Sequence, residues 1–83
     1  MIISKSYSII NRENESFLVN IDNGDIYLIN DVTLDVVTLC EKFETIDALC
    51  DYVFSKYANE GDYSKDELKL FVNNLIRNGI ICE

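Results

Sequence analysis

The sequence predicts an α+β domain in which a small three-stranded antiparallel sheet precedes a bundle of three helices. Hydrophobic residues recur with a period of two before Asn30 and with a period of about 3.6 after it. Asn23 and Gly24 stand between alternating apolar residues, a pattern typical of a tight hairpin. Ser64 and Glu67 form a capping box at the start of a late helix. The length of 83 residues allows a single domain, residues 1–83.

Three strands are expected over residues 6–11, 16–22 and 25–30, with a polar turn between the first two. Asn23 and Gly24 are expected to form a two-residue loop between the second and third strands, because both residue types tolerate positive φ.

This loop fixes the pairing of the last two strands, with Val19 opposite Leu28 and Ile21 opposite Ile26. We assign the face that carries these four residues and Phe17 to the core. The opposite face would then carry Leu18, Tyr27 and Ile29, which makes it unusually apolar for a surface exposed to solvent.

Three helices are expected over residues 31–42, 45–58 and 64–78, each with an apolar stripe. Thr45 and Ser64 are suitable caps for the second and third helices, and Gly79 is placed to end the third. The last residues, 80–82, either form a short strand or simply pack. A bundle of this size following a small sheet resembles a winged helix-turn-helix.

The charge balance argues against several classes of partner. Seven basic residues and fifteen acidic residues give a formal net charge of −8. Such a surface repels nucleic acid and anionic membranes, whose binding depends on Lys and Arg. No apolar run is long enough to cross a bilayer, and the N-terminus lacks a secretory pattern. We therefore expect a cytoplasmic protein with neither nucleic acid nor membrane as partner.

Residues for catalysis and metal binding are scarce. The chain has no histidine, and its three glycines form no phosphate-binding loop. Cys40 and Cys50 lie on apolar helix faces, where packing explains them, whereas Cys82 either packs or is a reactive thiol. The carboxylates are expected on solvated surfaces. We expect no enzyme activity, no metal site and no cofactor.

The third strand is the sharpest candidate for function. If it lies at the edge of the sheet, Tyr27 and Ile29 bond inward, whereas Ile26, Leu28 and Asn30 direct their N–H and C=O groups outward. No Lys, Pro or bulge blunts this edge, so an extended peptide can add a strand there. The alternative is that a helix, a loop or a second copy of the chain covers it.

The order and spacing of these pieces resemble the PqqD-like family of recognition elements. The resemblance rests on Ile26 to Asn30 followed by Val32-Thr33, on Thr45-Ile46, and on the stretch from Tyr63 to Ile81. It covers nearly the whole chain. Each piece is mostly hydrophobic pattern, and residues 36–39 are aliphatic where the family often has a tryptophan.

The resemblance implies a protein that binds the leader region of a ribosomally synthesised precursor peptide and presents it to a separate maturation enzyme. That enzyme would be a radical SAM maturase or the protease and cyclase of a lasso-peptide pathway. The leader would extend the sheet between the third strand and the third helix. The implied contacts are Asp25, Ile26, Tyr27, Leu28, Ile29 and Asn30 on the strand, and Lys69, Leu70, Asn73, Asn74 and Arg77 on the helix. A winged-helix DNA-binding regulator or a purely structural subunit is the alternative.

Overall fold

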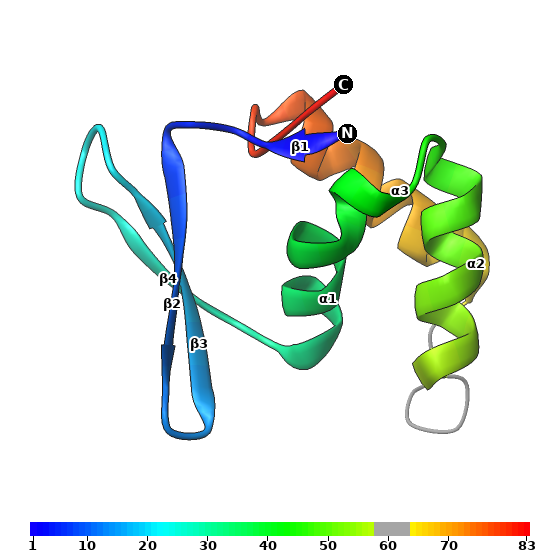
Figure 1. Ribbon diagram of the computed structural model, residues 1–83, viewed down its shortest axis with the longest axis horizontal. Coiled ribbons are helices and arrows are strands. Elements are labelled where there is room, and N and C mark those ends of the chain that lie inside the picture. Colours follow the sequence, from blue (N-terminus) through cyan, green and yellow to red (C-terminus); the bar gives the residue numbers. More distant parts are fainter. Residues whose placement is uncertain (58–63) are drawn as a thin grey trace.

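The computed structural model describes residues 1–57 and 64–83, so Ala58 and Tyr63 lie outside the described residues. The order of elements is β1 (Ile2–Ile3), β2 (Tyr7–Arg12), β3 (Glu15–Asn20), β4 (Ile26–Ile29), α1 (Asp31–Leu39), the 3₁₀ helix η1 (Cys40–Lys42), α2 (Ile46–Tyr57), α3 (Lys65–Arg77) and β5 (Ile81–Cys82). An antiparallel sheet of order β2-β3-β4 stands to one side of the three helices (Figure 1). The predicted α+β class is confirmed.

The hairpin between β3 and β4 has a longer loop than expected. The Asn20 N–H donates to the Asp25 carbonyl at 2.8 Å, and the Gly24 N–H donates to the Asn20 carbonyl at 2.7 Å. Residues 21–24 therefore form the loop, and Gly24 takes the positive φ of 82°. The Asn23 side chain accepts from the Asp25 N–H at 2.9 Å and holds the turn from within. The prediction of a two-residue loop is wrong.

The longer loop shifts the register by two residues, so that Phe17 pairs with Leu28 and Val19 with Ile26. A shift of two keeps every side chain on its own face. The assignment of the core face is nevertheless wrong, because Leu18 is the buried residue, at 3% exposure, and Ile29 packs against the core. The apolar set that includes Phe17, Val19, Ile26 and Leu28 faces away from the helices.

The junction at Asn30 explains which face is covered. Asn30 follows β4 directly and caps α1, its side chain accepting from the Thr33 N–H at 2.8 Å. Because no loop separates strand from helix, α1 folds back over the face that carries Ile29. The expected helix over residues 31–42 also divides, since α1 ends at Leu39 and η1 continues to Lys42. This tighter turn leads into Phe43, whose ring lies 5.6 Å from that of Tyr52.

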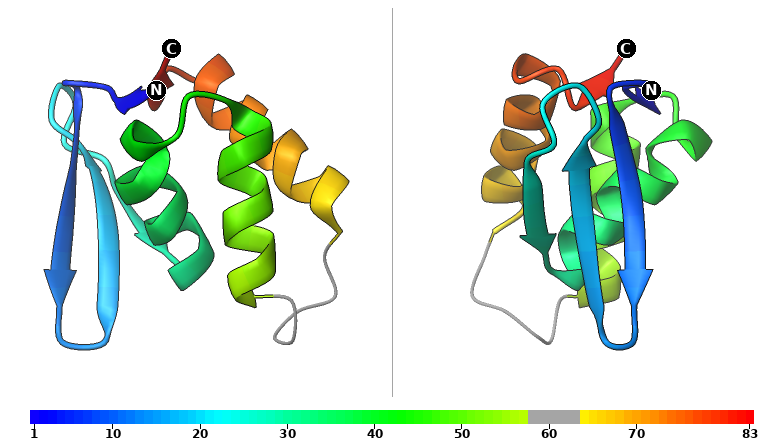
Figure 2. Two further views of the ribbon diagram at one scale, coloured as in Figure 1. Left: turned by 45° about the vertical axis from the view of Figure 1, so that its right-hand side comes forward. Right: turned by 90° about the vertical axis from the view of Figure 1, so that its left-hand side faces the viewer.

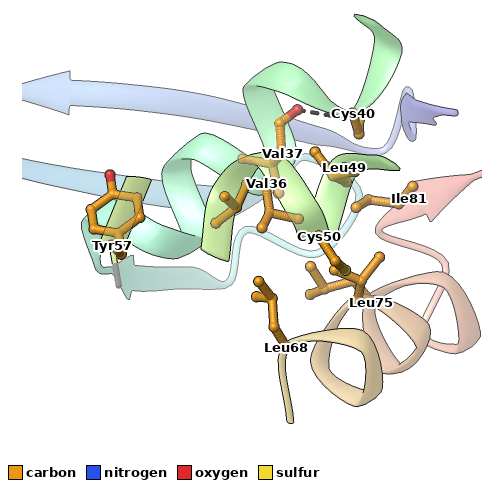
Figure 3. Close-up of a cluster of buried hydrophobic side chains, with 11 residues drawn as sticks. Val36, Val37, Cys40, Leu49, Cys50, Tyr57, Leu68, Leu75 and Ile81 are labelled. Atoms are coloured by element: carbon orange, nitrogen blue, oxygen red, sulfur yellow. Dashed lines mark hydrogen bonds between the residues drawn. The ribbon is translucent and has the colours of Figure 1, made fainter. Parts of the chain in front are cut away.

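The core lies among the helices. Buried side chains from α1, α2, α3 and β5 meet there (Figure 3). Cys40 and Cys50 are among them, which confirms packing roles for both; burial raises the pKa of each thiol. Cys82 is exposed. The buried residues of this cluster are Val36, Val37, Cys40, Leu49, Cys50, Val53, Tyr57, Leu68, Val72, Leu75 and Ile81.

Tyr57 ties the end of α2 to α1. Its hydroxyl lies 2.6 Å from Oδ2 of Asp35, and the Lys56 Nζ lies 2.7 Å from the same oxygen. Burial, followed by the hydrogen bond to Asp35, raises the pKa of Tyr57 to about 12. The neutral phenol is therefore the form that the fold stabilises.

The third helix ends as the sequence predicts. Gly79 has φ of 76°, its N–H donates to the Ile76 carbonyl at 3.0 Å, and the Ile80 N–H donates to the Leu75 carbonyl at 2.9 Å. These paired bonds form a Schellman motif, which turns the chain back toward the core. Ile81 then pairs with Ile3 and Cys82 with Ile2, so the last residues form a strand. Its partner β1 was not predicted.

We predict that Gly79→Ala lowers the free energy of unfolding by about 1–2 kcal/mol, the cost of a left-handed conformation for a residue with a Cβ. The cost is conformational, since an added Cβ meets no atom within 4 Å. Chemical denaturation measures the loss. Gly79→Asn is the matched variant and should lose less, because Asn tolerates this conformation. Equal losses for the two variants would contradict the argument.

We predict that Tyr57→Phe lowers the free energy of unfolding by about 1–2 kcal/mol at neutral pH, since one buried hydrogen bond to a charged group is lost. The raised pKa fixes the pH dependence. The wild-type advantage is full below the unfolded pKa of about 10 and falls as pH rises toward about 12. Denaturation curves at several pH values measure the difference. In Tyr52→Phe, a change at an exposed tyrosine, the advantage should be near zero throughout; a pH-independent loss for Tyr57→Phe would be inconsistent with the assignment.

Candidate functional site

The outer edge of β4 has no neighbouring strand in the part of the chain that the structure describes. At the end of β3, the Asn20 N–H donates to the Asp25 carbonyl and the N–H of the next residue, Ile21, donates to the Ser6 carbonyl, each at 2.8 Å. Successive residues therefore bond to opposite neighbours. Continuing this alternation along the β3–β4 register, Tyr27 and Ile29 bond inward. The backbone groups of Ile26 and Leu28 then point away from the sheet. The prediction placed Ile26, Leu28 and Asn30 in this outward set. Ile26 and Leu28 keep that place, because a register shift of two residues preserves it. Asn30 does not, because it lies beyond β4 and its carbonyl accepts from the Leu34 N–H at 2.9 Å.

A groove of about 1060 Å³ lies between the inner face of the sheet and α3. Of the three strands in this sheet, β4 lies on the α3 side (Figure 2, right-hand view). Apolar or aromatic residues make up half of the lining, and the other half is polar, with asparagine the commonest polar residue. The far wall is formed by Phe71, Leu75, Asn78 and Ile80. The other lining residues are Tyr7, Asn14, Glu15, Leu18, Asn20, Asn23, Tyr27, Leu28, Ile29, Asn30, Asp31 and Thr33.

A smaller hollow of about 270 Å³ continues the groove past the end of β4. It lies where two helices begin, with Asn30 capping α1 and Ser64 capping α3. Phe71 lines both hollows and connects them. The residues around the smaller one are Asn30, Val32, Thr33, Glu67, Leu68 and Phe71.

The structure places the predicted strand residues and the predicted helix residues differently. Tyr27, Ile29 and Asn30 line the groove. Leu28 borders it from the strand edge, because its side chain lies on the opposite face of the sheet from Tyr27, and Asp25 and Ile26 directly precede these residues. None of the five predicted helix residues lines it. The Lys69 Nζ instead lies 2.9 Å from Asp47 on α2.

The remaining four predicted helix residues also lie outside the lining. Asn73 follows Lys69 by about one turn of α3 and donates to its carbonyl at 3.0 Å. Leu70 is 61% exposed.

Sequence reasoning missed the residues of α3 that do line the groove. Phe71, Leu75 and Asn78 are spaced by four and then three residues and therefore share one stripe. Phe71 and Leu75 lie on the apolar stripe that the sequence predicts for this helix, which is typical of core residues, and Leu75 is indeed buried. The available signal was Asn78, a polar residue that continues an apolar stripe at the end of the helix.

Charge in and around the groove is sparse and negative. Glu15 and Asp31 are the charged residues of the described lining, and no Lys or Arg is among them. The Tyr27 hydroxyl donates to Asp25 Oδ2 at 3.3 Å, and the pKa of Tyr27 is raised, chiefly by the negative charge of Asp25. An extended chain of neutral or weakly basic character suits such a lining better than a polyanion.

The described residues contain neither a metal-binding cluster nor a membrane-spanning helix. Among the described residues, no group of three or more His, Cys, Asp or Glu side chains is placed to hold a metal ion. No helix in that same part of the chain combines the length and the apolar character needed to span a membrane.

The site as a whole is an open strand edge beside a groove of mixed apolar and polar lining. In strand addition an extended peptide pairs with such an edge, and its alternate side chains enter pockets beside it. Comparison with known proteins gives no matching family model and no matching curated protein. One solved structure has the same fold and is described as TbiB1 in complex with the TbiA(beta) leader peptide. The match has a TM-score of 0.65 at 15% identity and covers 94% of this chain and 86% of that one.

Proposed function

We propose that this protein is a recognition element of PqqD-like type, which binds the leader region of a ribosomally synthesised precursor peptide. The observation that carries the proposal is the outward row of backbone groups at Ile26 and Leu28, directly beside a groove walled by α3. The similarity in fold to a protein solved with a leader peptide supports the same reading. The role is non-catalytic and requires no cofactor.

In this proposal the leader adds as a strand to β4, with residues 25–30 as its partner. Backbone pairing supplies register and part of the affinity, whereas side-chain contacts in the groove supply selectivity. Phe71, Leu75 and Asn78 form the helix side of the contact. Because β4 is only four residues long, the interface is small and a few leader side chains dominate its affinity.

The bound leader is then presented to a separate maturation enzyme in the cytoplasm, either a radical SAM maturase or the protease and cyclase of a lasso-peptide pathway. The acidic character of the chain, with a net charge of −8, disfavours the alternative of a DNA-binding regulator.

The first test is an NMR titration of isotope-labelled protein with a synthetic leader from a precursor gene beside this one. We predict that backbone signals of residues 26–30 and of Phe71, Leu75 and Asn78 shift together. Signals of Asp47 and Lys69, on the other side of α3, serve as the internal control and should stay in place. Binding of a short duplex DNA with a steep salt dependence, and no response to the peptide, would overturn the proposal.

The second test replaces single backbone N–H groups by ester oxygens. Total synthesis is practical because the Leu39–Cys40 junction allows ligation of a synthetic segment 1–39. We predict that the ester at Leu28 weakens leader binding by about fivefold to tenfold, the loss of one hydrogen bond, and barely changes stability. The ester at Tyr27 is the matched variant and should lower stability, because that N–H bonds inward. Equal losses of affinity and stability for the Leu28 ester would mean that β4 does not present this edge to a guest.

A further inference from the structure

The outer face of the sheet, defined by Ser8, Ile10, Phe17, Val19, Ile26 and Leu28, is apolar although it faces away from the helices. The register arranges these residues in two rows that cross all three strands. One row is Ile10–Phe17–Leu28 and the other is Ser8–Val19–Ile26. Single exposed apolar residues are ordinary, but contiguous rows of them mark an interaction surface.

Exposure along these rows is highest at β4, the edge strand that borders the groove. Ile26 and Leu28 are 64% and 66% exposed, Ile10 on β2 is 43% exposed, and Phe17 and Val19 on the central strand are partly buried. Ile26 and Leu28 are also the residues whose backbone groups point away from the sheet. The most exposed apolar side chains and the unpaired hydrogen-bonding groups therefore belong to the same two residues.

A strand added to β4 necessarily touches both faces of the sheet. Successive side chains of a strand point to opposite faces, and directly opposite residues on neighbouring strands have Cβ atoms about 4.5–5.5 Å apart. One alternate set of guest side chains therefore enters the groove beside Tyr27 and Phe71. The other set lies next to Ile26 and Leu28 and adds a fourth member to each outer row. This division holds for either direction of the guest strand.

We propose that the outer face at Ile26 and Leu28 is the second half of the peptide site, so that the bound segment is recognised on both of its faces. This inference rests on the proposed function and deepens it. It specifies the ligand as a peptide with apolar side chains at consecutive positions, with one set filling the groove and the alternate set covering Ile26 and Leu28. A peptide that alternates apolar with charged residues satisfies the groove alone and binds more weakly.

The test uses a display library of random dodecapeptides selected against the wild-type protein and against an Ile26→Lys/Leu28→Lys double variant. For the wild type, apolar residues should be enriched at adjacent positions. For the variant, one alternate set should change to Asp and Glu while the other stays apolar, because only one set meets the new lysines. A peptide selected on the wild type should bind the double variant about tenfold more weakly, since two apolar cross-strand contacts are lost.

The matched control is Ile10→Lys, on the same face but on β2, at the side of the sheet away from β4, which should leave affinity within about twofold. Circular dichroism and thermal melting establish that all variants fold; these side chains are exposed, so folding should be retained. Enrichment that is unchanged in the double variant, or changed at both sets, overturns the inference while leaving the proposed function in place. A wild-type dimer that becomes monomeric in the double variant also overturns it, because a second copy would then cover the outer face. If no peptide is enriched by either protein, the proposed function itself fails.

Discussion

The direct passage from β4 into α1 at Asn30 is the constraint on which the site depends. The Asn30 side chain accepts from the Thr33 N–H, and its carbonyl accepts from the Leu34 N–H at 2.9 Å. Asn30 is therefore the only residue between β4 and α1. With so short a connection α1 lies beside the sheet, and Ile29 packs against the core (Figure 1). The position of α1 thereby decides which face of the sheet is inner and which is outer.

The fold could be predicted from the sequence wherever local chemistry decides it. Thr45, Ser64 and Gly79 mark helix ends through hydrogen bonds made within one turn, and the Thr45 and Ser64 side chains accept from Ala48 and Glu67 as those positions suggest. The alternating pattern of residues 16–29 likewise gives the hairpin and, through its parity, the outward backbone groups of β4. These features depend on neighbours only a few residues away.

Features that depend on distant partners could not be predicted in the same way. Both faces of the hairpin are apolar, so composition could not choose between Leu18 and Phe17 as the inward residue; the position of α1 makes that choice. The predicted helix residues do not line the groove. Lys69, for example, forms an ion pair with Asp47 on α2, a partner that the sequence does not reveal. The sequence does not predict β1, because two residues are too few to show the alternation of a strand, and its partner β5 lies far away in the sequence.

Ile2 pairs with Cys82, so the first and last strands of this fold lie side by side although 80 residues separate them in the sequence. Contacts of such wide sequence separation close the largest loop that the chain contains, and they form late. During synthesis β1 leaves the ribosome before the other elements of this fold, and β5 leaves it after them. The core that holds Ile81 is therefore completed only once β5 has emerged, whereas the local β3–β4 hairpin can pair earlier.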